Sequence, residues 1–197
     1  MKASIPLALL VAVLVGCKED SMEMVTEHVR IDDAKIDEGD PLAIIEPVWW
    51  NANIYEGEQK YNESLSPFSR EQRYVFAVIW YIDEVNNGGH DQFYSNSTGI
   101  VWKDALAGLR ALGMDEAVAI LQESAARMGG NPSLDRATRQ QQLASLQPNF
   151  DDLDTRFYAL QRRVDMDEAM RKYIRQHRQA FYFEGEVHKP KLGFKVK

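Results

Sequence analysis

Side chains that could ligate a metal gather in one short stretch of the sequence. Asp83 and Glu84 precede Asn-Asn-Gly-Gly, and His90 and Asp91 follow it. Carboxylates and an imidazole brought together at a turn are able to hold a divalent metal. The simpler interpretation is a structural turn, because Asn side chains hydrogen-bond nearby backbone groups and Gly adopts left-handed conformations. We favour the turn, expect no metal and little effect of the histidine on stability, and assign a structural role to Asn86, Asn87, Gly88, Gly89 and Gln92.

No other pattern in the sequence is typical of an enzyme. The histidines are scattered and form no H-x-x-x-H pair; they are His28, His90, His177 and His188. The sequence also lacks a Gly-x-Ser-x-Gly elbow, a phosphate-binding glycine loop and a Cys-x-x-Cys pair. We therefore expect a non-enzymatic protein that uses no cofactor.

The single cysteine, Cys17, lies where a bacterial lipoprotein signal would place it. Lys2 precedes an apolar run over residues 3–15 that is too short to span a bilayer. The run ends in Leu-Val-Gly-Cys, which resembles a lipobox, in which the cysteine is acylated after the signal is cleaved before it. An ordinary secretory signal is the alternative. We expect lipidation of Cys17 and anchoring in the cell envelope, whereas an unused signal would leave the protein in the cytoplasm.

The candidate turn follows a segment that must position it. Ser69 and Gln72 have the spacing of a capping box, and every residue over 74–82 is apolar or aromatic. A buried strand is the alternative, but the segment 70–86 is longer than most strands. The sequence therefore predicts a helix that is buried on most sides and ends at Asn-Asn-Gly-Gly.

The whole sequence predicts an all-α fold, with roughly seven to eight helices around this buried central helix in a single globular domain. Proline and glycine residues separate further helical patterns at about 47–65, 100–112, 115–128, 132–146, 151–163 and 165–183. The pattern that contains Arg136 and Arg139 is so polar that we expect it to face solvent. No strand is expected. The predicted parts are a signal peptide over 1–16, an acidic tether over 17–40, the helical domain over 41–183 and a loose tail over 184–197.

The turn and its surroundings resemble a known family. Residues 84–96 read E-V-N-N-G-G-H-D-Q-F-Y-S-N, after an aromatic-rich helix and before A-L-A-G-L-R-A-L-G at 105–113. This combination is similar to the core of the bacterial DNA-mimic protein family, over roughly residues 49–128. The resemblance implies an acidic, all-helical protein that forms a homodimer and occupies the DNA-binding face of a transcription factor.

Acidic residues are concentrated in the first half of the sequence. Residues 18–102 contain 17 Asp and Glu against six Lys and Arg, whereas residues 103–197 contain 13 against 16. Such a surface argues against direct nucleic-acid binding and suits a basic protein partner. We expect the partner to contact Asp32, Asp33, Asp37, Glu38, Glu56, Glu58 and Glu63.

Two alternatives stay open for this acidic half. Acidic surfaces in many proteins serve only solubility. The chain could also be a lipid-anchored envelope protein whose helical domain docks a periplasmic partner without mimicry of DNA.

Overall fold

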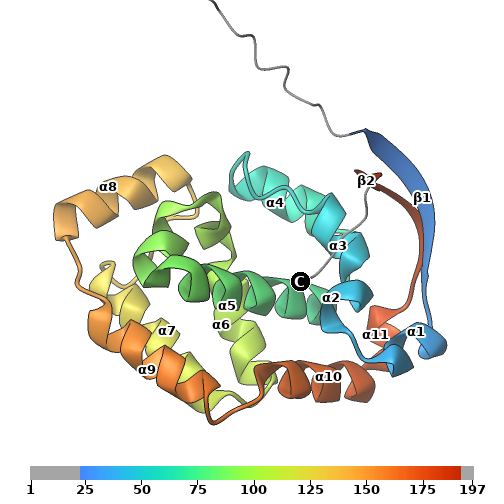
Figure 1. The fold of residues 1–197 in the computed structure, drawn as a ribbon. Coiled ribbons are helices and arrows are strands. Elements are labelled where there is room, and N and C mark those ends of the chain that lie inside the picture. The colour runs from blue at the N-terminus through green and yellow to red at the C-terminus, as the bar shows by residue number, and fades with distance from the viewer. Residues whose placement is uncertain (1–22, 192–197) are drawn as a thin grey trace, which may run out of the picture.

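The structure, a computed structural model, describes residues 23–191 and is mostly helical (Figure 1). Eleven α-helices, one 3-10 helix and a two-stranded sheet make up this part of the chain. The expected all-α class is confirmed, although the helices are more numerous and the sheet was not expected. The predicted signal peptide and Cys17 lie outside the described residues. No helix over 23–191 has both the length and the apolar composition needed to cross a membrane.

A long buried helix, α5 (Arg70–Ser95), runs through the middle of the molecule, as predicted (Figure 1). Its capping box forms: the Gln72 N–H donates to Ser69 Oγ at 3.1 Å, and the Ser69 N–H donates to Gln72 Oε1 at 2.9 Å. The apolar run supplies most of the core, with Val75, Phe76 and Tyr81 almost fully buried. The helix does not end at Asn-Asn-Gly-Gly, however, but resumes after a break and continues for one and a half turns.

The helices that follow α5 pack around it. They are the 3-10 helix η1 (Ser97–Val101) and the α-helices α6 (Trp102–Ala111), α7 (Asp115–Arg127), α8 (Arg136–Leu146), α9 (Asp151–Gln161), α10 (Met166–Gln176) and α11 (Arg178–Phe181). Helix α6 lies closest to α5, because a Cβ at Gly108 would approach the Tyr74 carbonyl oxygen to 2.9 Å. The helix predicted over 165–183 is interrupted at His177, where α10 ends and α11 begins.

Four short helices precede α5: α1 (Asp33–Glu38), α2 (Pro41–Ile44), α3 (Glu46–Asn51) and α4 (Glu58–Leu65). The single helix expected over 47–65 is therefore wrong, because residues 52–57 form a bend between α3 and α4. Gly57 takes a φ of +87° in this bend, a conformation that interrupts a right-handed helix.

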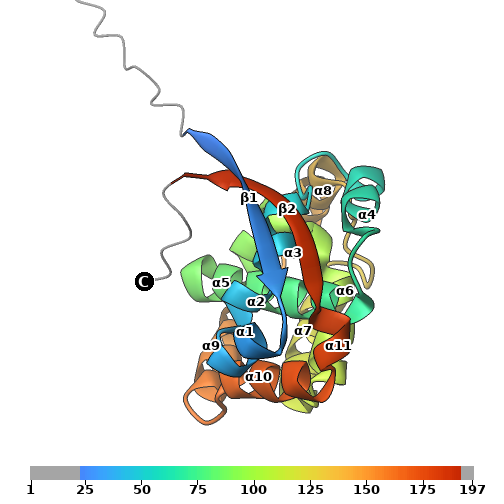
Figure 2. The ribbon, with the colours of Figure 1, turned by 90° about the vertical axis from the view of Figure 1, so that its right-hand side faces the viewer.

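The two ends of the described chain pair as an antiparallel sheet. Strand β1 (Met24–Ile31) and strand β2 (Phe183–Pro190) run side by side over α3 (Figure 2). The predicted tether and loose tail are therefore wrong for these segments. Ile31 belongs to the hydrophobic core of the helices and Phe183 packs against that core, which ties both strands to the helical body.

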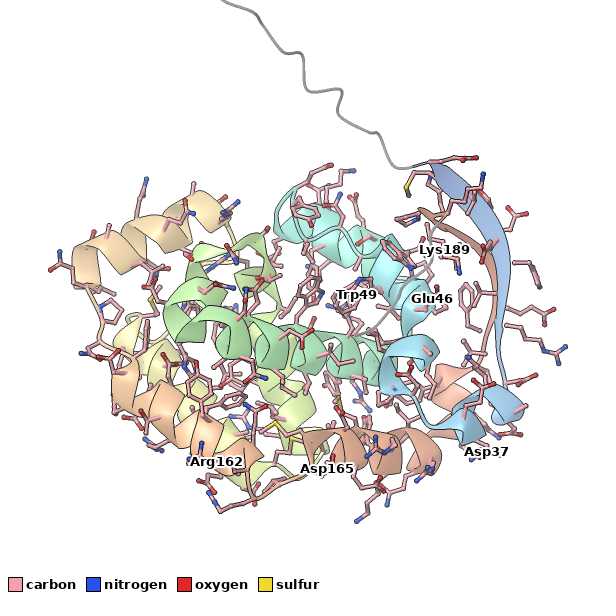
Figure 3. All side chains as sticks on the ribbon, in the orientation of Figure 1. Asp37, Glu46, Trp49, Arg162, Asp165 and Lys189 are labelled. Carbon is pink, nitrogen blue, oxygen red and sulfur yellow. The ribbon has the colours of Figure 1, made fainter. Side chains whose placement is uncertain are left out.

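A buried lysine fastens the sheet to the helices. Lys189 of β2 is 8% exposed, and its Nζ lies 2.9 Å from Glu46 of α3 and 2.7 Å from Glu27 of β1 (Figure 3). Trp49 of α3 in turn stacks on Trp80 of α5, with ring centroids 4.4 Å apart. The segments outside the central helices thus form one body with them.

Candidate functional site

The break in α5 lies at the two glycines of the candidate turn. Gly89 has a φ of +72°, whereas Gly88 has a φ of −161°, which any residue can adopt. The expected positive φ is thus found at only one of them. Both glycines allow a neighbouring side chain to lie close to the backbone. A Cβ at Gly88 would lie 2.2 Å from the Gln92 side chain, and a Cβ at Gly89 would lie 2.2 Å from the Asp154 carboxylate.

His90, the first residue after the break, is fully buried. Its ring Nδ1 lies 2.5 Å from Asp154 Oδ1, and its Nε2 lies 2.9 Å from the Tyr81 hydroxyl. Because a carboxylate accepts hydrogen bonds, we assign the ring proton to Nδ1, and the Tyr81 hydroxyl then donates to Nε2. Both ring nitrogens are occupied, so this histidine has no lone pair to offer a metal.

Glu84 holds the two halves of α5 together across the break. It is 8% exposed and accepts hydrogen bonds from Gln92 Nε2 at 2.8 Å, Asn96 Nδ2 at 2.9 Å and Thr98 Oγ1 at 2.7 Å. All of its donors come from residues that follow the break. Three hydrogen bonds from neutral donors meet the hydrogen-bonding needs of this buried carboxylate. The arrangement is structural and not reactive.

The other residues of the turn face outward. Asn86 exchanges two hydrogen bonds with Gln161 of α9, at 3.0 and 2.6 Å, rather than bonding the backbone of the turn as expected. Asn87, Asp83 and Asp91 are exposed. The structure does not bring together the four candidate metal ligands, which are Asp83, Glu84, His90 and Asp91. Over residues 23–191 no group of three or more His, Cys, Asp or Glu is placed to hold a metal ion.

Asp83 nevertheless has an unusual electrostatic environment. Its carboxylate is exposed, yet nearby protein atoms partly desolvate it, and it lies near two further carboxylates, Asp167 and Glu84. This desolvation, reinforced by the two negative neighbours, raises the pKa of Asp83 to about 6. Asp83 lines an open depression of about 640 Å³ together with Asn86 and residues 161–167, and no Ser, Thr, Cys, Tyr, Lys or His is among the residues that line it.

The sequence model of the DMP19-like protein family matches residues 66–177, which is more than half of the chain. The chain belongs to the DMP19-like family. This confirms the family that residues 84–96 indicated. Comparisons with curated proteins and with solved structures found no significant match.

The DMP19-like match covers the broken helix and the helices around it, from α5 to α10. Within it, the side chains on either side of the Asn-Asn-Gly-Gly motif are turned inward: Glu84 and His90 are buried and Gln92 bonds to Glu84. Asn86, Asn87 and Gly88 themselves are exposed.

All of the carboxylates that were expected to contact a partner precede the DMP19-like match, and they fall into two groups. Asp32, Asp33, Asp37 and Glu38 lie at α1, whereas Glu56, Glu58 and Glu63 lie on α4 and the bend before it. Helix α1 and helix α4 lie on different sides of the molecule in both views (Figures 1 and 2). The expected residues therefore do not form one surface.

Two of the four carboxylates at α1 pair with a single arginine. Arg178 of α11 donates from Nε to Asp33 Oδ1 at 2.6 Å and from Nη2 to Asp37 Oδ1 at 2.7 Å. Tyr182 also donates to Asp33, at 2.8 Å. The hydrogen bonds from Arg178 and Tyr182 lower the pKa of Asp33. These contacts join α1 to α11, which is a structural use of the charges.

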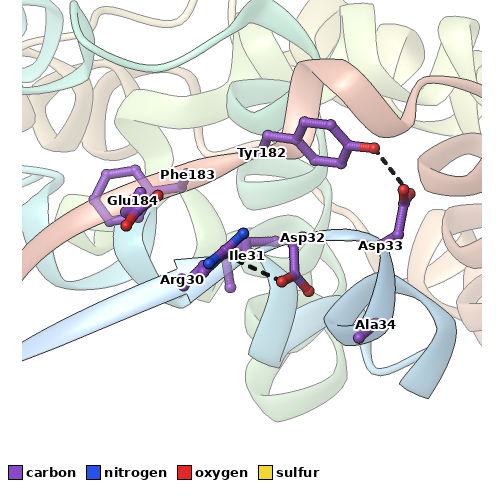
Figure 4. Close-up of a pocket in the computed structure, with 8 residues that line it drawn as sticks. All are labelled: Arg30, Ile31, Asp32, Asp33, Ala34, Tyr182, Phe183 and Glu184. Atoms are coloured by element: carbon purple, nitrogen blue, oxygen red, sulfur yellow. Dashed lines mark hydrogen bonds and ion pairs between the residues drawn. The ribbon is translucent and has the colours of Figure 1, made fainter.

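The remaining two carboxylates at α1 are also engaged. Asp32 accepts from the Lys35 N–H at 3.2 Å as the N-cap of α1, and it lies 3.2 Å from Arg30. Glu38 pairs with the Lys35 ammonium at 2.6 Å. Figure 4 shows the open depression of about 550 Å³ beside them, which residues 30–34 and 182–184 line. The Tyr182 hydroxyl and the Asp33 carboxylate that it contacts both line this depression, and Arg178 holds the same carboxylate.

The second acidic group is less engaged. Glu63 pairs with Lys60 at 2.9 Å. Glu56 and Glu58 are exposed, and neither forms an ion pair with any residue from 23 to 191. Between them and α3 lies Tyr55, which is 76% exposed. This bend and the start of α4 are the part of the expected surface that is open to a partner.

Two residues that hold the DMP19-like core together were not anticipated. Asp154 supports the break in α5 from α9. Arg139 of α8 is fully buried, against the expectation that it faces solvent, and donates to the carbonyl oxygens of Tyr94 at 2.7 Å and Asn96 at 2.6 Å. It thus satisfies carbonyl groups at the end of α5 that no further helical turn can pair. No local sequence pattern distinguishes either residue from its polar neighbours.

Proposed function

We propose that the protein is a non-enzymatic binding domain that presents carboxylates to a basic protein partner. The observation that carries this proposal is that Glu56 and Glu58 are exposed on an ordered bend without a compensating ion pair in the described part of the chain. They lie in the acidic half of the sequence, where 17 Asp and Glu outnumber six Lys and Arg. Charge of one sign attracts an oppositely charged partner and accelerates its association.

The proposal rests on Glu56, Glu58 and Glu63 and leaves out the carboxylates at α1. Those at α1 bind Arg30, Lys35 and Arg178, so a partner would have to displace existing ion pairs to reach them. Glu56 and Glu58 form no ion pair over residues 23–191, so a partner that engages this second group has to displace only the contacts of Glu63 with Lys60 and Gln59. The binding surface that we propose is therefore the bend over residues 52–57 together with α4, and we call it the α4 surface.

The class of partner follows from where the protein acts. Membership of the DMP19-like family supports a DNA-binding protein as the partner. The lipobox that ends at Cys17 supports a second candidate, a lipid-anchored protein whose partner is a basic protein of the envelope. In both cases the partner is basic, and direct binding of nucleic acid is not part of the proposal.

The test compares two variants that remove the same charge from different places. One variant is Glu56→Gln, Glu58→Gln, Glu63→Gln, which empties the α4 surface of carboxylates. The control is Asp91→Asn, Asp115→Asn, Glu186→Gln, which neutralises three exposed carboxylates that lie elsewhere and form no ion pair over residues 23–191. The partner is first captured from the native host at low salt with the wild-type protein, and its association rate is then measured with each variant.

We expect the α4 variant to associate more slowly and with a weaker salt dependence, while the control keeps the wild-type rate apart from a small general effect. Equal rates for both variants would show that the α4 surface is only a solvated face. Competition with duplex DNA then separates the two candidates. A partner that releases DNA when it binds this protein supports mimicry, and an envelope protein that binds no DNA supports the second candidate.

A further inference from the structure

Tyr55 is the most exposed large hydrophobic side chain over residues 23–191. It is 76% exposed, whereas the next, Leu146, is 50% exposed. Within the described residues its hydroxyl has no hydrogen-bond partner, and its ring has no aromatic or cationic neighbour. Tyr is enriched among the residues that dominate binding energy at protein interfaces. A ring displayed in this way has no structural role that explains its exposure.

The backbone under this ring is fixed from both sides. Asn53 Oδ1 accepts hydrogen bonds from the N–H groups of Tyr55 and Glu56, each at 3.1 Å. The Asn53 N–H donates in turn to Ser64 Oγ of α4 at 2.9 Å, and Ile54 is buried in the core. A ring on an ordered bend loses little conformational freedom when a partner covers it, which favours binding.

The surroundings of the ring select the chemistry of its partner. Glu56 follows Tyr55 directly and Glu58 begins α4, so two exposed carboxylates without ion pairs lie within three residues of the ring in the sequence. A guanidinium group stacks on an aromatic face and donates paired hydrogen bonds to a carboxylate at the same time. An ammonium group offers a compact point charge and cannot do both. The combination therefore suits arginine better than lysine.

We infer that Tyr55 is the centre of the α4 surface and binds an arginine side chain of the partner, with Glu56 or Glu58 accepting its hydrogen bonds. This inference rests on the proposed function and makes the partner more specific, an arginine-bearing protein rather than any basic one. The bend precedes the DMP19-like match over residues 66–177. Recognition would thus reside outside the residues that the family model matches.

The test uses two peptides of about twelve residues, one in which Arg alternates with Gly and one in which Lys replaces Arg. Their affinities for the protein are measured at about 20 mM salt, where exposed charges are weakly screened. The variants are Tyr55→Ala and Tyr55→Phe. Leu146→Ala serves as the control because it truncates another exposed hydrophobic side chain, on α8.

We expect the wild-type protein to bind the Arg peptide about two- to fivefold more tightly than the Lys peptide, the range of an exposed cation–π contact. Tyr55→Ala should abolish this preference, while Tyr55→Phe and Leu146→Ala keep it. Equal affinity of both peptides for the wild-type protein, or a preference that survives in Tyr55→Ala, would overturn the inference.

The variant that lacks the three α4 carboxylates separates this inference from the proposed function. If it loses affinity for both peptides while Tyr55→Ala changes nothing, the acidic surface stands and the role of the ring is refuted. If it binds both peptides as the wild type does, the proposed function fails together with the role of Glu56 and Glu58 in the inference, and abolition of the Arg preference by Tyr55→Ala would support the contact between arginine and the ring alone.

Discussion

Asp154 accepts two hydrogen bonds from His90, although 64 residues separate them in the sequence. One comes from the His90 backbone N–H at 3.0 Å and the other from its ring at 2.5 Å. A helix that restarts after a break has N–H groups without partners, and Asp is among the residues preferred at such a start. Here the capping carboxylate comes from α9 instead of from the same helix.

Replacement of His90 by Ala should therefore destabilise the protein. It leaves a cavity and removes a partner from both Tyr81 and Asp154, which together cost about 2–4 kcal/mol of unfolding free energy. The burial of this histidine reverses the expectation that it is dispensable. Asp154→Ala should cost about 1–3 kcal/mol. Urea unfolding of both single variants and the double variant should give less than the sum of the two losses, and strict additivity would refute the coupling.

Gly89→Ala should be more damaging than Gly113→Ala. Both glycines have a φ above +70°, but only the Cβ added at Gly89 meets other atoms, at 2.2 Å from Asp154 Oδ2. We expect a loss of about 1–2 kcal/mol at Gly113 from the backbone conformation alone. The loss at Gly89 should exceed it by at least about 1 kcal/mol, because the cap of α5 must move as well. Similar melting temperatures for the two variants would exclude a tight contact between the break and α9.

The raised pKa of Asp83 predicts that the stability of the protein depends on pH in an unusual way. Its pKa of about 6 in the folded state lies above the ordinary value of 3.8. Between these values the folded state binds more protons than the unfolded state, so its contribution to the unfolding free energy decreases as the pH rises. Asp83→Asn should therefore melt at a higher temperature than the wild type at pH 7 and at the same temperature at about pH 3, below both pKa values. Asp91→Asn, on the exposed side of the same helix, is the control, and parallel profiles for wild type and Asp83→Asn would contradict the prediction.

The central helix was predictable because its signals are local. A capping box and nine consecutive apolar or aromatic residues lie within one continuous stretch, and each acts on its near neighbours. The glycines also act on their near neighbours, which is why the sequence predicted an interruption of the helix at this position. The continuation of α5 after Gly89 depends on Asp154 and Glu84, contacts that the sequence order does not reveal.

The sheet and the buried arginine were missed for a related physical reason. The apolar residues of β1 are interspersed irregularly with polar and charged ones, and its partner lies at the other end of the chain, so the segment resembles a solvated tether until β2 is placed beside it. Arg139 has polar neighbours in the sequence, and only the carbonyl groups at the end of α5 make its burial favourable. Seven acidic residues could be named from the sequence, but which of them are neutralised depends on Arg178, far along the chain.

Removal of β2 should destabilise the protein, contrary to the behaviour of a loose tail. We compare a chain that ends after Tyr182 with one that ends after Lys191, which retains every residue of the sheet. Loss of the buried Val187 alone costs about 1.5–3 kcal/mol, and loss of Lys189 leaves Glu27 and Glu46 without their shared cation. The shorter chain should therefore unfold at lower denaturant concentration. Coincident unfolding curves would show that the sheet adds nothing to stability.

Cys17→Ser tests the expected lipid anchor. The wild-type protein should incorporate labelled palmitate and sediment with membranes, because several acyl chains hold a protein far more firmly than one. The variant should do neither and should migrate with the mass of an unprocessed or differently processed chain. A variant that stays bound to membranes and has the wild-type mass would exclude the lipobox.

The pairing of β1 with β2 also determines when the fold can be completed during synthesis. Partner residues such as Ile31 and Phe183 are separated by about 150 positions, so β1 leaves the ribosome long before β2 exists. At roughly 5–20 residues per second, β1 waits for about 8–30 seconds with its apolar side chains uncovered. The central helix and its neighbours are complete in that interval, whereas the sheet forms only once the final strand has been released. The N-terminal strand is therefore the part of the nascent chain that most needs protection from premature pairing.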